Sequence, residues 1–139
     1  AEAYSNGTND DKVRTSFALP DSGAKRRRIP NIQEIGRSLA AKGFLVNVVK
    51  LEEIPLAQQI LYFSTSDVIV AQHGAGLSNI IWAQPGTQVM EIMPREILSK
   101  RGCHSIYFSE LARLLKLKYT QIDQDSIYSE VDPRSIRIY

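Results

Sequence analysis

The chain has 139 residues, of which 43% are hydrophobic and 23% are charged, a composition typical of a globular protein rather than a disordered or fibrous one. A chain of this length can bury a core without disulfides or a metal, and its single cysteine provides no disulfide framework. Seventeen basic and fifteen acidic residues leave a net charge of +2, which is too small to indicate a polyanionic partner. No apolar run reaches the roughly 18–20 residues that cross a bilayer, and the first residues lack the apolar stretch of a secretory signal.

The first dozen residues differ in composition from the rest of the chain. They are polar and show no apolar periodicity, so we expect a mobile tail over residues 1–12 and one folded domain over residues 13–139. The domain opens with a strand predicted over Val13–Leu19, which turn residues then end. Four consecutive basic residues, Lys25–Arg28, follow in a loop.

The clearest local pattern is that of a helix over Asn31–Lys42. Asn31 is followed three residues later by Glu34, which fits a capping box at the start of a helix. Apolar residues then recur at helical spacing until Gly43, which can end the helix.

The rest of the chain alternates between apolar, β-branched runs and segments of helical periodicity. In chain order, the elements we expect are a strand over Phe44–Leu51, a helix over Pro55–Ser64, a strand over Asp67–Ala71, a helix beginning near Ala75 or Gly76, a strand over Val89–Met93, a helix over Ser109–Leu117 and a strand over Tyr119–Ile122. Strands and helices that alternate at this spacing predict an α/β fold, with a Rossmann-like, mostly parallel sheet and helices on both faces.

A glycine-containing loop, Gln72–Asn79, follows the most apolar of these strands. In a parallel sheet, ligands bind outside the carboxyl ends of the strands, where helices begin. Because Gly74 and Gly76 lack a Cβ, a phosphate could approach the backbone amides of Gly74, Ala75 and Gly76 closely. A tight turn without a ligand is the alternative. The loop is not a dinucleotide fingerprint, because Asn79 stands where the third glycine is required.

Two titratable side chains accompany this loop. His73 stands where the strand ends, and its neutral and charged forms are both accessible near pH 7, so it is a candidate functional residue or a structural hydrogen-bonding group. Glu91 lies within an apolar strand, where an unpaired carboxylate is costly to bury. It could accept hydrogen bonds from a ribose diol at the sheet edge, or it could be a paired structural carboxylate.

Two charged patterns remain. Arginine's planar fork suits a diphosphate, so one or two side chains of Lys25–Arg28 could contact it, whereas a solvated charge run and a nucleic-acid patch are the alternatives. The nucleic-acid patch lacks the interleaved aromatic residues that single-stranded partners require. Asp123 and Asp125 form a D-x-D triplet that could hold a divalent metal, although its acidic, polar surroundings favour an exposed turn.

The stretch Asp67–Pro94, DVIVAQHGAGLSNIIWAQPGTQVMEIMP, resembles the signature of glycosyltransferase family 61. The likeness combines, in order, the buried strand, the HGAGLSN motif, the Pro85-Gly86 turn and the strand that contains Glu91. Weaker agreement extends from about Arg28 to Tyr119. The family includes plant xylosyl- and arabinosyltransferases, O-linked N-acetylglucosamine transferases of the secretory pathway and bacterial capsular-polysaccharide enzymes.

The resemblance implies a metal-independent transferase of the two-domain GT-B type, of which this chain is the half that binds the nucleotide-sugar. Carried over by position, the residues that would line the donor site are Arg28, His73, Gly74, Gly76, Ser78, Asn79 and Glu91. Gln58 stands where the family usually has an acidic residue, which argues against a base on that helix. Leu19-Pro20 replaces the arginine that usually closes the first strand, which leaves Arg27 or Arg28 to contact the diphosphate.

We therefore expect the donor-binding part of an inverting glycosyltransferase that uses a nucleotide-sugar and needs no cofactor, metal or nucleic acid. The acceptor would be a glycan or a protein, bound by an N-terminal domain that this chain lacks. His73 would act in catalysis, because a donor at that position can offset charge on the departing diphosphate. A stand-alone nucleotide-binding module and a metal-dependent transferase that uses Asp123 and Asp125 are the alternatives. The compartment would be the Golgi or ER lumen in a eukaryote and the cytoplasmic face of the membrane in a bacterium.

Overall fold

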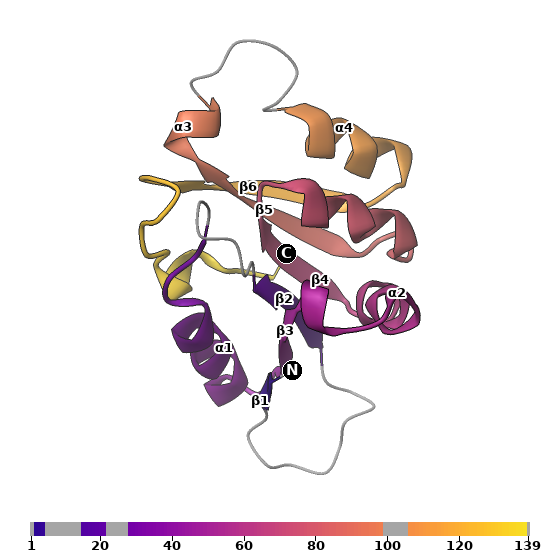
Figure 1. Ribbon diagram of the computed structural model, residues 1–139, viewed down its shortest axis with the longest axis horizontal. Coiled ribbons are helices and arrows are strands. Elements are labelled where there is room, and N and C mark those ends of the chain that lie inside the picture. The colour runs from indigo at the N-terminus through magenta and orange to yellow at the C-terminus, as the bar shows by residue number, and fades with distance from the viewer. Residues whose placement is uncertain (1, 5–14, 22–27, 99–105, 139) are drawn as a thin grey trace.

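The computed structural model describes residues 2–4, 15–21, 28–98 and 106–138, which form a six-stranded sheet flanked by helices (Figure 1). The strands are β1 (Glu2–Tyr4), β2 (Ser16–Asp21), β3 (Leu45–Lys50), β4 (Val68–Gln72), β5 (Gln88–Pro94) and β6 (Lys118–Gln124). Their order is β1-β3-β2-β4-β5-β6, and all neighbouring pairs are parallel except β1 with β3. The predicted α/β fold with a mostly parallel, Rossmann-like sheet is confirmed.

Helices cover both faces of this sheet. The helical elements are α1 (Ile32–Ala41), η2 (Leu51–Glu53), α2 (Leu56–Ser64), η3 (Ala75–Trp82), α3 (Arg95–Leu98), α4 (Tyr107–Leu114) and η5 (Pro133–Ser135), where η marks a 3-10 helix. The core on one face combines residues of α1 with residues that follow β6, and the core on the other face combines residues of α2, η3 and α4. Figure 1 shows α1 on one side of the sheet and α2 and α4 on the other.

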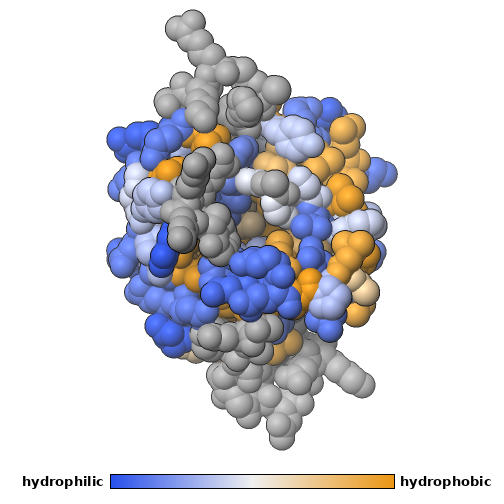
Figure 2. Space-filling model, in the orientation of Figure 1, coloured by the Kyte–Doolittle hydropathy of each residue, from blue (hydrophilic) through white to orange (hydrophobic). Residues whose placement is uncertain are grey.

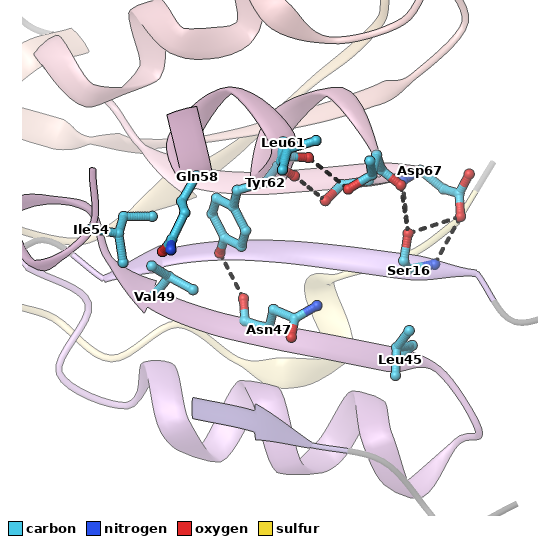
Figure 3. Close-up of a pocket in the computed structure, with 11 residues that line it drawn as sticks. Ser16, Leu45, Asn47, Val49, Ile54, Gln58, Leu61, Tyr62 and Asp67 are labelled. Atoms are coloured by element: carbon cyan, nitrogen blue, oxygen red, sulfur yellow. Dashed lines mark hydrogen bonds between the residues drawn. The ribbon is translucent and has the colours of Figure 1, made fainter. Parts of the chain in front are cut away.

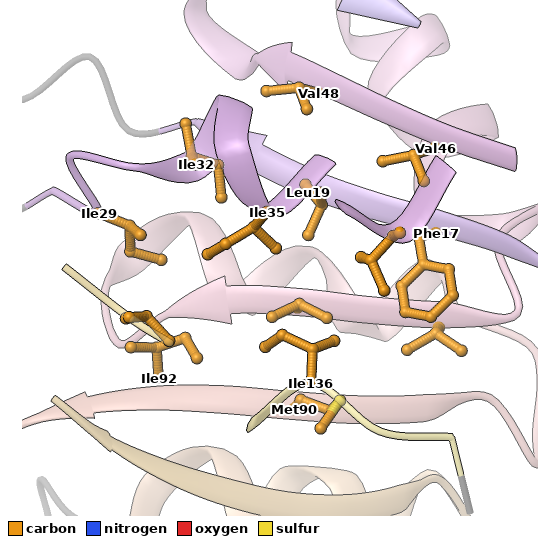
Figure 4. Packing of buried hydrophobic residues seen from close by; sticks show 14 of the residues in the cluster. Phe17, Leu19, Ile29, Ile32, Ile35, Val46, Val48, Met90, Ile92 and Ile136 are labelled. Carbon is orange, nitrogen blue, oxygen red and sulfur yellow. The ribbon is translucent and has the colours of Figure 1, made fainter. Parts of the chain in front are cut away.

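The first four residues of β4, Val68–Ala71, are all apolar because both faces of this strand are covered. Val68 and Val70 belong to the core cluster beside α1, whereas Ile69 and Ala71 belong to the cluster beside α2 and η3. Successive side chains of a strand point to opposite faces, so a strand that is covered on both faces must be apolar at every position. Figure 4 shows the first cluster, in which Phe17 and other buried residues pack between α1 and the sheet.

The order of the parallel strands places a topological switch point between β2 and β4. From β2 the chain crosses by α1 to β3 on one side, and from β3 it returns by α2 to β4 on the other side of β2. The chain therefore leaves the carboxyl end of β2 toward β3 and the carboxyl end of β4, through η3, toward β5. Because the two connections run in opposite directions, a crevice opens between the ends of β2 and β4. Ligands of open parallel sheets bind in this crevice.

Helix α1 ends as its sequence predicts but begins differently. Gly43 has φ 97°, and the N–H groups of Gly43 and Phe44 donate to the carbonyl groups of Ala40 and Leu39, which is a Schellman motif. Asn31 occupies the N-cap position but makes no side-chain cap. Its amide instead contacts Glu34 and pairs with the backbone of a distant segment, so the predicted capping box is wrong.

Helix α4 ends three residues earlier than the predicted helix over Ser109–Leu117. Lys116 adopts φ 59°, and the N–H groups of Lys116 and Leu117 donate to Arg113 and Ala112 in a second Schellman motif. Glycine usually occupies this position, so the lysine gave no signal that the helix ends there.

Two further elements differ from the prediction, and one is confirmed. Glu2–Tyr4, within the predicted tail, is a strand paired with β3. The helix predicted to begin near Ala75 or Gly76 is confirmed: it begins at Ala75 and is a 3-10 helix. Strand β6 extends to Gln124, so Asp123 belongs to a strand and not to an exposed turn. None of the helices in the described ranges is long and apolar enough to cross a membrane.

Candidate functional site

The glycine loop lies at the switch point, directly after β4 (Figure 1). Gly74 precedes η3 with an extended backbone, φ 162° and ψ 176°, so the loop needs no left-handed residue at this position. The first N–H groups of a helix have no intrahelical acceptor. The amides at the start of η3, beginning with Ala75, are therefore potential donors to an anion.

Gly76 is exposed and faces a nearby leucine side chain. A Cβ added at Gly76 would lie 3.4 Å from Cδ1 of Leu51, which is an ordinary van der Waals contact. A single methyl group therefore fits here, whereas a branched side chain would meet Leu51 or fill the approach to the loop. The absence of a side chain at this position keeps the space beside the loop open.

His73 and Glu91 form a buried pair. Nδ1 of His73 lies 2.6 Å from Oε2 of Glu91, and the two residues are 8% and 0% exposed. The hydroxyl of Tyr119 donates to Oε1 of the same carboxylate at 2.5 Å. Both carboxylate oxygens thus contact protein groups. Of the two roles considered for Glu91, the structure therefore shows the paired structural carboxylate. The predicted direct contact of Glu91 with a ribose diol does not fit this arrangement.

The pairing determines the hydrogen-bonding state of the imidazole. An ionised carboxylate only accepts hydrogen bonds, so Nδ1 of His73 donates to Glu91. The neutral ring then carries its lone pair on Nε2, and protonation there produces an imidazolium whose charge the carboxylate balances. Phe108 packs edge-on against the ring with centroids 5.3 Å apart, which holds its plane.

The sequence analysis missed Tyr119 as a site residue. Tyr119 pairs with Val89 in the parallel ladder, and Val89 lies on the same face of β5 as Glu91, so Tyr119 is a diagonal neighbour of the carboxylate. Burial, followed by the hydrogen bond and the charge of Glu91, raises the pKa of Tyr119 above its usual range. The hydroxyl therefore stays protonated and acts as a donor. Only the strand register, which the sequence did not supply, could have identified this neighbour.

Arg28 lies at the same edge of the sheet. Its carbonyl oxygen accepts hydrogen bonds from the side-chain amides of Gln72 and Gln124, and its N–H donates to the carbonyl oxygen of Ile127. The side chain of Arg28 is exposed. Arg27, the other arginine expected to contact a diphosphate, lies outside the described residues.

The remaining predicted residues lie farther along η3. Asn79 donates from its side-chain amide to the carbonyl oxygen of Gly76 at 2.9 Å, which stabilises the first turn of η3. Ser78 is half-buried within the same element. The structure thus places Arg28 next to the end of β4. Asn79 contributes by stabilising the backbone of the glycine loop.

The two aspartates of the D-x-D triplet lie at the end of β6. Asp123 accepts a hydrogen bond from the side chain of Gln121 at 3.0 Å, and Asp125 is an exposed residue 3.5 Å from Arg95. Within the described ranges, the structure contains no group of three or more histidine, cysteine, aspartate and glutamate residues that could hold a metal ion.

A cavity of about 550 Å³ lies elsewhere, between α2 and the outer face of β3 (Figure 3). Tyr62 crosses it, and its hydroxyl donates to the carbonyl oxygen of Asn47 at 2.6 Å. Gln58, which stands where the family usually has an acidic residue, also lines it. Of the predicted donor-site residues that the structure describes, none lines it. The cavity is therefore separate from the switch point.

Apolar side chains are also exposed on the outer surfaces of α2, η3 and α4. Figure 2 shows them on one side of the molecule, opposite α1. They include Leu61, Ile81, Trp82 and Leu114, which are 37% to 68% exposed. None of them belongs to the predicted donor site.

A comparison with known families identifies the family of this chain. A family model described as Glycosyltransferase 61 matches residues 7–90, which is more than half of the chain. The chain belongs to this family, as the HGAGLSN motif predicted.

Two rice proteins are similar to the chain. Beta-1,2-xylosyltransferase XYXT1 of Oryza sativa subsp. japonica is 27% identical over 134 residues, which are 94% of this chain and 28% of that protein. Beta-1,2-xylosyltransferase XAX1 of the same organism is 27% identical over 101 residues, which are 72% of this chain and 17% of that protein. The chain thus spans less than a third of the length of either relative.

Proposed function

We propose that this chain is the nucleotide-sugar-binding part of a glycosyltransferase. The observation that carries the proposal is that Arg28, His73 and the amides of the glycine loop all lie at the carboxyl end of β4, at the switch point of a parallel sheet. Phosphates bind at such positions because free amides and cations meet there. Membership of glycosyltransferase family 61 supports a sugar nucleotide as the phosphate-bearing ligand.

In the proposed reaction, an acceptor hydroxyl attacks the anomeric carbon while the bond from that carbon to the diphosphate oxygen breaks. Attack from the opposite face inverts the anomeric centre, and the acceptor proton passes to a base outside this chain. The loop amides and Arg28 contact the departing diphosphate, and Nε2 of protonated His73 donates to it as its charge grows. Removal of one such donor typically costs about 10²–10³ in rate. In this scheme neither a metal nor a cofactor is needed.

The proposed partners follow from the same scheme. The acceptor is a glycan or a protein hydroxyl, held by an N-terminal domain that the longer relatives have room to contain. Both relatives are described as β-1,2-xylosyltransferases, so a nucleotide-activated xylose is the donor sugar to test first.

Calorimetric titration of the chain with UDP, GDP, ADP and CDP tests the proposal, with each titration repeated in the presence of a chelator. We expect one of these diphosphates to bind and the chelator to leave its affinity unchanged. Absence of binding to all four would overturn the donor-binding proposal. Binding that the chelator abolishes would favour a metal-dependent site, with Asp123 and Asp125 as the residues to mutate.

A further inference from the structure

Two glutamine side chains meet on the face of the sheet that carries α1. Nε2 of Gln72 donates to Oε1 of Gln124 at 2.7 Å, although β4 and β6 are separated by β5. Gln124 is 2% exposed. A buried side-chain amide lowers stability unless its polar atoms form hydrogen bonds. The hydrogen bonds of Gln124 therefore explain how a glutamine can occupy this position.

Both side-chain amides of this pair donate hydrogen bonds to the backbone of Arg28. Nε2 of Gln72 donates to the carbonyl oxygen of Arg28 at 3.3 Å, and Nε2 of Gln124 donates to the same oxygen at 3.2 Å. The N–H of Arg28 donates to the carbonyl oxygen of Ile127 at 2.9 Å. Both backbone polar groups of Arg28 are therefore anchored, although its side chain is exposed.

The same amides bind the segment that follows β6. Gln124 also donates to the carbonyl oxygen of Ser129 at 2.7 Å, and Gln72 to that of Ile127 at 3.2 Å. The pair thus joins the ends of β4 and β6 to the residues before α1 and to the residues after β6. No other side chain in the described part of the chain is shown to bind the Arg28 carbonyl.

We infer that Gln124, together with Gln72, is a positioning residue that fixes Arg28 at the diphosphate site, an inference that rests on the proposed function. A free arginine loses rotamer and backbone freedom when it binds a phosphate. Anchoring both backbone groups of Arg28 removes the backbone part of this cost before the ligand arrives. Gln72 also connects Arg28 to the glycine loop through the backbone, because His73 is the next residue in the chain. The side chains of Gln72 and His73 point to opposite faces of the sheet.

The test compares diphosphate binding with binding of the matching nucleoside. The probe is whichever of UDP, GDP, ADP or CDP binds the unmodified chain most tightly, measured by calorimetry. Gln124→Leu and Gln72→Leu should each weaken diphosphate binding about tenfold, which corresponds to about 1.4 kcal/mol. Nucleoside binding should not change. In an Arg28→Ala background, neither substitution should cause further loss, because the side chain that they position is gone.

Gln88→Leu is the matched control. Gln88 is also buried, at 4% exposure, and its Nε2 donates to the carbonyl oxygen of Arg137 at 2.8 Å, but it lies at the opposite end of the strands. It should lower the Tm without changing the affinity for the diphosphate. If Gln124→Leu fails to fold, Gln72→Leu, at a half-buried position, carries the same test.

The outcomes separate this inference from the proposed function. If the unmodified chain binds none of the diphosphates, the proposed function is wrong. If it binds one but Gln124→Leu and Gln72→Leu leave its affinity unchanged, the inference is wrong and the proposed function stands. Equal losses for diphosphate and nucleoside, or a further loss in the Arg28→Ala background, would equally overturn the positioning role.

Discussion

His73 is bound to Glu91 through the ring nitrogen nearer its own backbone, Nδ1, at 2.6 Å, in a place where the carboxylate has no exposed surface. The other carboxylate oxygen is held by Tyr119. The carboxylate therefore acts on a ligand only through the imidazole, by fixing which nitrogen carries the proton. This relationship makes the state of the histidine ring measurable without an activity assay.

Glu91→Gln should change the tautomer of His73. An amide offers one acceptor oxygen and one donor nitrogen, so it cannot accept from both Nδ1 of His73 and the hydroxyl of Tyr119. We expect nitrogen-15 NMR of the neutral imidazole to show mainly the Nδ1–H form in the unmodified chain and a larger share of the Nε2–H form in the variant. Because the chain has two histidines, His104→Gln assigns the signals. The same tautomer in both proteins would contradict the assigned pairing.

Tyr119→Phe should make stability less sensitive to alkaline pH. The raised pKa of Tyr119 means that the folded chain keeps a proton that the unfolded chain loses above about pH 10. The resulting stability is complete below that pH and is lost as the pH rises further, so the free energy of unfolding should fall less steeply in the variant. Denaturant titrations from neutral pH to about pH 11 measure this slope.

Tyr62→Phe is the control for this experiment. Burial also raises the pKa of Tyr62 above its usual range, so its removal should reduce the alkaline slope in the same direction. It lies at the α2 cavity, away from His73. Only Tyr119→Phe should also alter the imidazole signals. If the alkaline slope of Tyr119→Phe equalled that of the unmodified chain, the result would contradict a Tyr119 hydroxyl that stays protonated in the folded chain.

His73→Ala should weaken transfer more than it weakens donor binding in an enzyme completed with its acceptor domain. Charge on the diphosphate grows as the sugar departs, so the contact is worth most in the transition state. We expect kcat/KM to fall by an amount that corresponds to a loss of about 2–4 kcal/mol of transition-state stabilisation. The affinity for the diphosphate should change much less. Phe108→Leu, which keeps the pair with Glu91, should mainly lower the Tm. A near-normal kcat in His73→Ala would show that His73 has a structural role and not a catalytic one.

Gly76→Val should abolish donor binding in a chain that still folds. The added methyl groups would approach Leu51 and occupy the space beside the loop, with a stability loss of about 1–3 kcal/mol. Gly76→Ala is the control, because a single Cβ fits at 3.4 Å and should change stability by only about 0.5 kcal/mol. Calorimetry and thermal melts measure both effects. Unchanged affinity in the valine variant would show that the loop is only a turn.

Lys116→Gly should stabilise the chain. Lys116 adopts φ 59° at the end of α4, a conformation that costs a residue with a Cβ about 1–2 kcal/mol. The gain should be about 1 kcal/mol, because the more flexible unfolded glycine offsets part of it. Gly43→Ala, at φ 97° at the end of α1, is the reverse change and should destabilise by a similar amount. A loss of stability in Lys116→Gly, seen by urea denaturation, would contradict the strain at this position.

The sequence predicted well those features that local composition determines. The buried strand that became β4, the glycine loop and the helix that ends at Gly43 all carry their signals within a few residues. Gln124 and Tyr119 carried no such signal. In the D-x-D triplet the two aspartates drew attention, whereas the structure buries the glutamine between them, and only the alternation of a longer β6 shows this. Both residues matter through partners on other strands, which requires the register.

The pairing of Asn31 with Val131 bears on the order in which the chain folds. The side-chain amide of Asn31 donates to the carbonyl oxygen of Val131 at 2.7 Å, its side-chain oxygen accepts from the Val131 N–H at 2.9 Å, and the two residues are 100 positions apart. The core beside α1 includes Val131 and Ile136, so it closes only after Ile136 has been synthesised. Most of the opposite core comes from residues 63–117, whose contacts span shorter separations. Loop closure favours contacts at short separation, so the face with α2, η3 and α4 should gain hydrogen-exchange protection before the face with α1.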